Sequence, residues 1–88
     1  MKLAGKVALV TGTSPNIGGG IAEGLAAEGA KLVCVDVRGE NAEQCAEAIQ
    51  RQGGEAFGLR CDVTDEAEVR AVVEAARDRF GGLDILVN

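Results

Sequence analysis

The chain has 88 residues, a net charge of −5 and 47% apolar side chains, which is enough for one small domain. The negative charge disfavours nucleic acid and anionic membranes as partners, and no apolar run is long enough to span a membrane. The absence of histidine excludes a metal site built from imidazole, and the absence of a cleavable signal before the first strand leads us to expect a cytoplasmic protein.

The first predicted element is a buried strand over residues 7–10, which leads into a glycine-containing loop over residues 11–18. After this loop, apolar side chains recur at helical spacing, at Ile21, Ala22, Leu25 and Ala26. A strand that turns through glycine into a helix directs the N–H groups and the positive dipole end of that helix at one point. The first turn therefore predicts a phosphate-binding loop.

The second predicted strand covers residues 31–36 and is apolar enough to be buried on both faces. Asp36 closes this strand about 18 residues after Gly18, where a carboxylate would meet a ribose hydroxyl. The alternative is that Asp36 only caps the loop that follows it. Together, the glycine loop and the acid predict a dinucleotide-binding unit.

A second helix is predicted from an apolar stripe, and a third strand over residues 55–61 follows it. The stripe consists of Ala42, Cys45, Ala46 and Ile49, and Gly53 and Gly54 end the helix. Three cysteines without CxxC spacing argue against a redox or metal motif. Cys34 in the second strand and Cys45 on the stripe are predicted to be small core residues.

The last predicted elements are a helix after residues 62–65 and a fourth strand over residues 83–87. Asp65 and Glu68 have the spacing of a capping box at the start of this helix. Gly81 and Gly82 end it. Its buried stripe is predicted to be Val69, Val72, Val73, Ala76 and Phe80.

The alternation β-α-β-α-β-α-β predicts an α/β fold with a Rossmann-type parallel sheet, helices on both faces and right-handed crossovers. We expect the strand order 3-2-1-4, which places the glycine loop at the switch point where such sheets bind ligands. Residues 1–88 are then the dinucleotide-binding half of a Rossmann domain, truncated after the fourth strand. That strand would be an apolar edge that favours pairing with another chain.

Four motifs carry a resemblance to a known family: residues 5–12 with Ile17 and Gly18, residues 35–36, residues 61–64, and residues 82–88. In this order and spacing, they resemble the short-chain dehydrogenase/reductase family over the whole chain. The last motif matches the start of the family's Asn-Asn-Ala-Gly element. The family's loop is Thr-Gly-x-x-x-Gly-x-Gly, and its middle glycine is Asn16 here. Asparagine is the residue that best replaces glycine in a left-handed conformation.

The resemblance implies a set of cofactor-binding residues: Gly12, Ser14, Asn16, Ile17, Gly18, Asp36, Val37, Asp62, Val63 and Asn88. It implies a tight turn at Gly12 and close approach of the pyrophosphate at Gly18. Asp62 would contact the adenine edge, with a helix cap as its alternative role. Val63 would pack on the adenine ring, and Asn88 would lie near the adenosine ribose.

The resemblance also bears on cofactor choice, and we expect NAD rather than NADP. A carboxylate at Asp36 accepts hydrogen bonds from ribose hydroxyls and repels a 2′-phosphate. Family members that prefer NADP often carry a basic residue at the positions occupied here by Pro15 or Val37. Arg38 lies one residue further on, where a solvated loop arginine is expected, although it could swing toward a 2′-phosphate.

The family's catalytic groups are a tyrosine, a lysine four residues later and a serine, all in the second half of the fold. This chain has no tyrosine, and its lysines are Lys2, Lys6 and Lys31, so no catalytic residue is carried over. For the whole protein, the resemblance implies an oxidoreductase that moves hydride between nicotinamide and a small-molecule alcohol or carbonyl substrate, and we expect a homo-oligomer. The alternatives are a stand-alone nucleotide-binding module without catalysis, and a methyltransferase that binds S-adenosylmethionine. Residues 62–63 and 83–88 argue against the methyltransferase.

Overall fold

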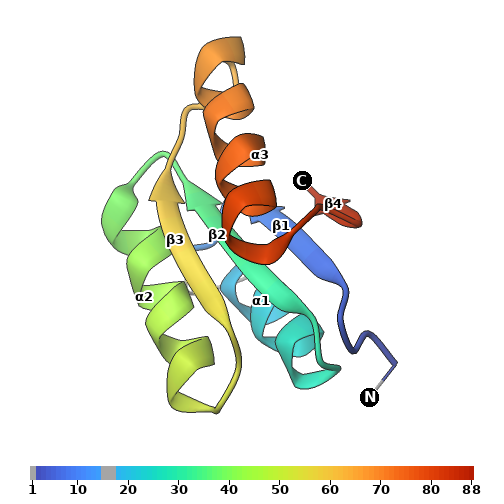
Figure 1. The fold of residues 1–88 in the computed structure, drawn as a ribbon. Helices are drawn as coiled ribbons and strands as arrows, with labels where there is room; N and C mark the ends of the chain where they lie inside the picture. Colours follow the sequence, from blue (N-terminus) through green and yellow to red (C-terminus); the bar gives the residue numbers. More distant parts are fainter. Residues whose placement is uncertain (1, 15–17) are drawn as a thin grey trace.

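A computed structural model describes residues 2–14 and 18–88 of the chain (Figure 1). Within these ranges, strands and helices alternate along the sequence, as predicted. Their order is β1 (Val7–Thr11), α1 (Gly18–Ala27), β2 (Lys31–Asp36), α2 (Gly39–Arg51), β3 (Ala56–Arg60), α3 (Glu66–Phe80) and β4 (Ile85–Val87). None of the helices in the described ranges is both long and apolar enough to cross a membrane.

The strands form a parallel sheet in the order β3-β2-β1-β4, which confirms the predicted topology. Thr11 lies opposite Val35 in the register, and Val10 lies opposite Val87. Asp36 lies opposite Arg60. Because the strands are parallel, the carboxyl ends of β1, β2, β3 and β4 meet along one edge of the sheet.

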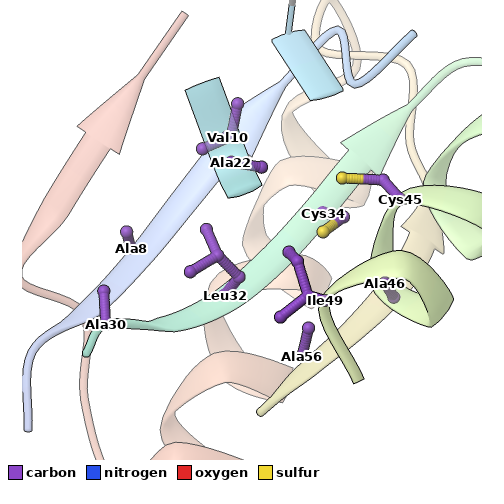
Figure 2. Packing of buried hydrophobic residues seen from close by; sticks show 10 residues of the cluster. All are labelled: Ala8, Val10, Ala22, Ala30, Leu32, Cys34, Cys45, Ala46, Ile49 and Ala56. Atoms are coloured by element: carbon purple, nitrogen blue, oxygen red, sulfur yellow. The ribbon is translucent and has the colours of Figure 1, made fainter. Parts of the chain in front are cut away.

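The sheet separates two hydrophobic cores, because successive side chains of a strand point to opposite faces. The helices α1 and α2 cover one face and α3 covers the other (Figure 1). The first core is formed by Ala8, Val10, Ala22, Ala30, Leu32, Cys34, Cys45, Ala46, Ile49 and Ala56 (Figure 2). The second is formed by Val7, Leu9, Val33, Val35, Phe57, Cys61, Val72 and Ala76. Both β1 and β2 are buried on both faces, and the predicted stripe of α2 is buried throughout.

The ends of α3 follow the predicted capping residues with one difference. Asp65 is the N-cap, and its Oδ1 accepts hydrogen bonds from the N–H groups of Ala67 at 2.9 Å and Glu68 at 3.3 Å. The side chain of Glu68 does not complete the capping box, because the N–H of Asp65 donates to the carbonyl of Asp62 at 3.0 Å. Gly81 ends the helix with a φ of 86°.

Two of the apolar side chains expected on helix stripes are exposed: Ile21 at 41% and Val69 at 37%. The fourth strand is also shorter than predicted, since β4 begins at Ile85, and Leu86 is 61% exposed. Ile21 lines the same hollow as Val87, and Val69 lines the same hollow as Leu86. In the described part of the chain, β4 pairs only with β1 and is the outermost strand, which leaves the side chains beside it exposed.

Candidate functional site at the carboxyl edge of the sheet

The loop after β1 is folded tightly against the start of α1. Gly12 has a φ of +68°, a conformation that strains any residue with a side chain. A Cβ atom added to Gly18 would overlap the carbonyl oxygen of Gly12, so this close approach requires glycine. No acidic residue lies in the first turn of α1, which leaves its positive dipole end uncompensated by an acidic side chain.

Thr13 fastens this loop to the end of β2. Its side chain is buried, and both its N–H and its hydroxyl donate to the carbonyl oxygen of Val35, at 3.3 and 3.2 Å. The phosphate-loop candidate therefore lies beside the residue that precedes Asp36.

Four of the predicted site residues line one hollow beside this loop. The hollow has a volume of about 390 Å³ and is lined by Val10, Thr11, Gly12, Ser14, Gly18, Ile21, Val87 and Asn88. The structure thus brings together Gly12 and Ser14 from the loop after β1, Gly18 from the start of α1 and Asn88 from the end of the chain after β4. Two further predicted residues, Asn16 and Ile17, lie outside the described residues.

Asp36 ends β2 with a side chain that is only 8% exposed. Its Oδ1 accepts a hydrogen bond from the N–H of Arg38 at 2.8 Å, which orients the carboxylate at the edge of the sheet. No ion pair reaches this carboxylate from the part of the chain that the structure describes, so it can still accept hydrogen bonds from a ligand. Val37, the next predicted residue, is 57% exposed beside it.

Asp62 is held by its own loop and does not cap α3, because Asp65 is the N-cap. The alternative role expected for Asp62 was therefore wrong. Its Oδ1 accepts hydrogen bonds from the hydroxyl of Thr64 at 2.7 Å and from the N–H of Thr64 at 2.9 Å. These two bonds hold the pKa of the Asp62 carboxyl below its usual range, and the bond from the hydroxyl has the larger effect. Asp62 is thus a carboxylate at neutral pH.

Val63 opens onto a second, mostly apolar hollow on the α3 face of the sheet. Its side chain is 56% exposed, and the hollow has a volume of about 180 Å³. The lining residues are Leu9, Thr11, Val35, Cys61, Val63, Val69, Val72, Val73, Leu83, Leu86 and Asn88. An exposed valine beside an apolar hollow offers a surface for a flat ring.

Thr11 and Asn88 line both hollows and mark the place where they meet. The hydroxyl of Thr11 lies 3.4 Å from the carbonyl oxygen of Val87 and 3.5 Å from Oδ1 of Asn88. Thr11 is a site residue that was not predicted, although its place before Gly12 in the loop motif was the available signal. Ile21 was also missed, since helical periodicity predicted it to be buried.

The cysteines are free thiols buried in the cores, as predicted for Cys34 and Cys45 (Figure 2). A hydrogen bond from Cys34 to Cys45, together with burial, raises the pKa of the Cys34 thiol, and the same bond lowers the pKa of Cys45. Burial, with nearby acidic side chains, raises the pKa of Cys61. Cys34 and Cys61 are therefore protonated at neutral pH and are not nucleophiles.

Comparisons with known proteins match nearly the whole chain. A family model described as short chain dehydrogenase matches residues 6–88. Galactitol 2-dehydrogenase of Agrobacterium fabrum is 48% identical over 88 residues, which cover 100% of this chain and 33% of that protein. D-threitol dehydrogenase of Mycolicibacterium smegmatis is 45% identical over 87 residues, which cover 99% of this chain and 34% of that protein.

The fold has a close counterpart among solved structures. A crystal structure of hydroxysteroid dehydrogenase from Escherichia coli matches with a TM-score of 0.94 and 41% identity, covering 99% of this chain and 37% of that chain. The chain thus spans about a third of the length of the curated relatives it matches.

Proposed function

The chain belongs to the short-chain dehydrogenase family, and we propose that it is the NAD(H)-binding portion of a longer oxidoreductase of this family. The observation that carries the proposal is the meeting of four features at one edge of the sheet. These are the glycine turn at the start of α1, the carboxylate of Asp36 at the end of β2, the loop of Asp62 and Val63 after β3, and Asn88 between the two hollows.

Each feature suits a different part of a dinucleotide. The glycine turn and the uncompensated start of α1 would bind the pyrophosphate, with Ser14 as a further donor. Asp36 would accept hydrogen bonds from the hydroxyls of the adenosine ribose. Val63 would pack against the adenine ring, and Asp62 would contact its polar edge. When bound, the nicotinamide would supply hydride transfer, and the residues named above would hold the adenosine and the pyrophosphate of the same cofactor.

NAD is preferred over NADP in this proposal because of the charge at Asp36. A 2′-phosphate on the adenosine ribose would lie against this carboxylate, and two like charges in a partly buried site repel strongly. Arg38 contributes its backbone N–H to Asp36. The exposed Val37 provides no positive charge that could compensate for the phosphate.

The whole protein would act on a small-molecule alcohol or carbonyl compound. Two of its relatives are named galactitol 2-dehydrogenase and D-threitol dehydrogenase. The 88 residues contain no tyrosine, so the family's catalytic tyrosine would have to come from further sequence, and the isolated chain would be inactive. We also propose that the whole protein is a cytoplasmic homo-oligomer.

Titration calorimetry with NAD and NADP tests the cofactor proposal. Asp36→Ala should weaken the binding of NAD and strengthen the binding of NADP, which brings the ratio of the two dissociation constants toward one. Asp78→Ala is the matched control, because it removes one negative charge from an exposed position on α3. An unchanged NAD to NADP ratio in Asp36→Ala would refute the role of Asp36, and wild-type protein that binds neither nucleotide would refute the proposed function.

The intact mass of the natural polypeptide separates the oxidoreductase from the alternative. A mass well above 9.0 kDa supports a longer enzyme, for which hydride transfer to NAD can be assayed with alcohols. A mass of 9.0 kDa would support a stand-alone nucleotide-binding module without catalysis.

A further inference from the structure

We propose that Glu68 is a positioning residue that holds the loop of residues 61–64 in the shape that receives adenine. This inference rests on the proposed function. Its basis is a juxtaposition: Oε1 of Glu68 accepts a hydrogen bond from the N–H of Asp62 at 3.0 Å and another from Nη1 of Arg60 at 3.2 Å.

Glu68 reaches an unusual target for its place in the helix. It is the third residue after the N-cap of α3, where a glutamate ordinarily bonds the N–H of the N-cap residue. That N–H, on Asp65, already donates to the carbonyl of Asp62 at 3.0 Å. The carboxylate of Glu68 therefore extends three residues further back and bonds the N–H of Asp62.

The bond is one of a set that holds the loop on both sides of Asp62. The N–H of Cys61 donates to the carbonyl of Asp36, the carboxylate of Asp62 is bonded by Thr64, and the N–H of Asp62 is bonded by Glu68. The peptide that carries the Asp62 N–H joins Cys61 to Asp62. Without the Glu68 acceptor, this peptide can rotate, and the Asp62 carboxylate and the Val63 side chain move with it.

Length of the side chain, rather than its charge, is what this role requires. The ion pair between Arg60 and Glu68 is solvent-exposed, with 58% and 35% of the two side chains accessible, and such pairs contribute little. The bond to the Asp62 N–H is partly buried and has a direct effect on the loop. Two substitutions separate length from charge. Glu68→Asp keeps the charge beside the helix N-terminus but shortens the reach, and Glu68→Gln keeps the reach but removes the charge.

Binding of the two halves of the dinucleotide tests the proposal. We expect Glu68→Asp to weaken the binding of NAD and AMP by about fivefold to tenfold, because one hydrogen bond is lost. The affinity for nicotinamide mononucleotide should stay unchanged. Glu68→Gln should stay within about twofold of wild type for all three ligands. Glu74→Ala, at an exposed acidic position on the same helix, is the control and should bind all three ligands like wild type.

Hydrogen exchange provides the second readout. The N–H of Asp62 should exchange faster in Glu68→Asp than in wild type, while the N–H groups of β2 keep their protection. The proposal is overturned if Glu68→Asp binds AMP like wild type, or if Glu68→Gln loses as much affinity as Glu68→Asp. Equal weakening of AMP and nicotinamide mononucleotide would also overturn it, because it would indicate general destabilisation. If wild type binds no NAD at all, the proposed function fails first and this inference fails with it.

Discussion

The carbonyl oxygen of Asp36 accepts a hydrogen bond from the N–H of Cys61 at 3.0 Å. Arg60 is the last residue of β3 and lies opposite Asp36 in the register, so this bond extends the pairing of β2 with β3 by one residue. It joins the residue proposed to bind ribose to the start of the loop proposed to bind adenine. A displacement of Asp36 or of the loop after β3 is therefore expected to displace the other, because a backbone hydrogen bond joins them.

Replacing Gly18 should disrupt the phosphate loop. The Cβ atom in Gly18→Ala would overlap the carbonyl oxygen of Gly12, so the loop or the start of α1 must move. We expect a loss of at least about 2 kcal/mol in the free energy of unfolding and loss of NAD binding. Urea unfolding and calorimetry measure the two effects.

Gly24→Ala is the matched control within α1. Nothing lies within 4 Å of the Cβ position at Gly24, and the residue is exposed. Alanine is the better helix former by about 1 kcal/mol, so this variant should be more stable and bind NAD normally. A Gly18→Ala variant as stable as wild type would contradict the close packing of the loop.

Removing the hydroxyl of Thr64 should raise the pKa of Asp62. That hydroxyl is the main cause of the lowered pKa, and Thr64→Val keeps the shape and the N–H of the residue but not the hydroxyl. Thr64→Ser keeps the hydroxyl and should leave the pKa low. A carbon-detected NMR titration of the Asp62 carboxyl measures both variants, and an unchanged pKa in Thr64→Val would disprove the role of the hydroxyl.

The sign of the effect on stability follows from the direction of this shift. Because folding lowers the pKa of Asp62 below its ordinary value of 3.8, the hydrogen bonds stabilise the fold above that pH and less as pH falls through the folded pKa. In Thr64→Val, the free energy of unfolding should therefore fall less steeply with decreasing pH than it does in wild type. A curve with the same acid slope would contradict this prediction.

Most of the fold could be predicted from the sequence because its strands are continuous apolar runs. The strand Lys31–Asp36 was predicted residue for residue, since an apolar run ends there at a single acid. The stripe of α2 was predicted from its periodicity alone. Periodicity fixes the direction of a side chain but not what covers it, which is why Ile21 and Val69 were expected to be buried and are exposed.

The positions of the site residues on the sheet could be predicted from the sequence, but the hydrogen bonds that hold them could not. The carboxyl ends of parallel strands meet at one edge, so the meeting of Gly12, Asp36 and Asn88 follows from the strand order. The target of Glu68 could not be predicted, because the competing bond from the Asp65 N–H to Asp62 depends on the path of the loop. The cofactor-binding roles of all the predicted residues stay predictions, and Asn16 and Ile17 also lie outside the described residues.

The paired thiols should differ in their rates of alkylation. Cys34 is fully buried and its hydrogen bond to Cys45 keeps it protonated, whereas Cys45 is 6% exposed and has a lowered pKa. Iodoacetamide should therefore modify Cys45 before Cys34, since the thiolate is the reactive form. Peptide mass spectrometry over time measures the order, and faster modification of Cys34 would contradict this prediction.

Asp84 should stabilise the pairing of β1 with β4. Its Oδ2 accepts a hydrogen bond from the N–H of Val7 at 2.9 Å, and its own N–H donates to the carbonyl of Val7 at 2.8 Å. Asp84→Ala removes the first bond and leaves the second. We expect it to lower the free energy of unfolding by about 1 kcal/mol, the usual net value of one hydrogen bond, and Asp84→Asn to lose less because its amide oxygen can still accept.

Urea unfolding measures this loss, and hydrogen exchange at Val7 assigns it to the edge of the sheet. The N–H of Val7 should exchange faster in Asp84→Ala, because water replaces the carboxylate as its acceptor. Asp78→Ala, which removes an exposed carboxylate from α3, should change neither quantity. If Asp84→Ala unfolds at the same urea concentration as wild type, the backbone bonds of β4 alone hold the register, and the carboxylate of Asp84 has no part in placing Asn88 beside the glycine loop.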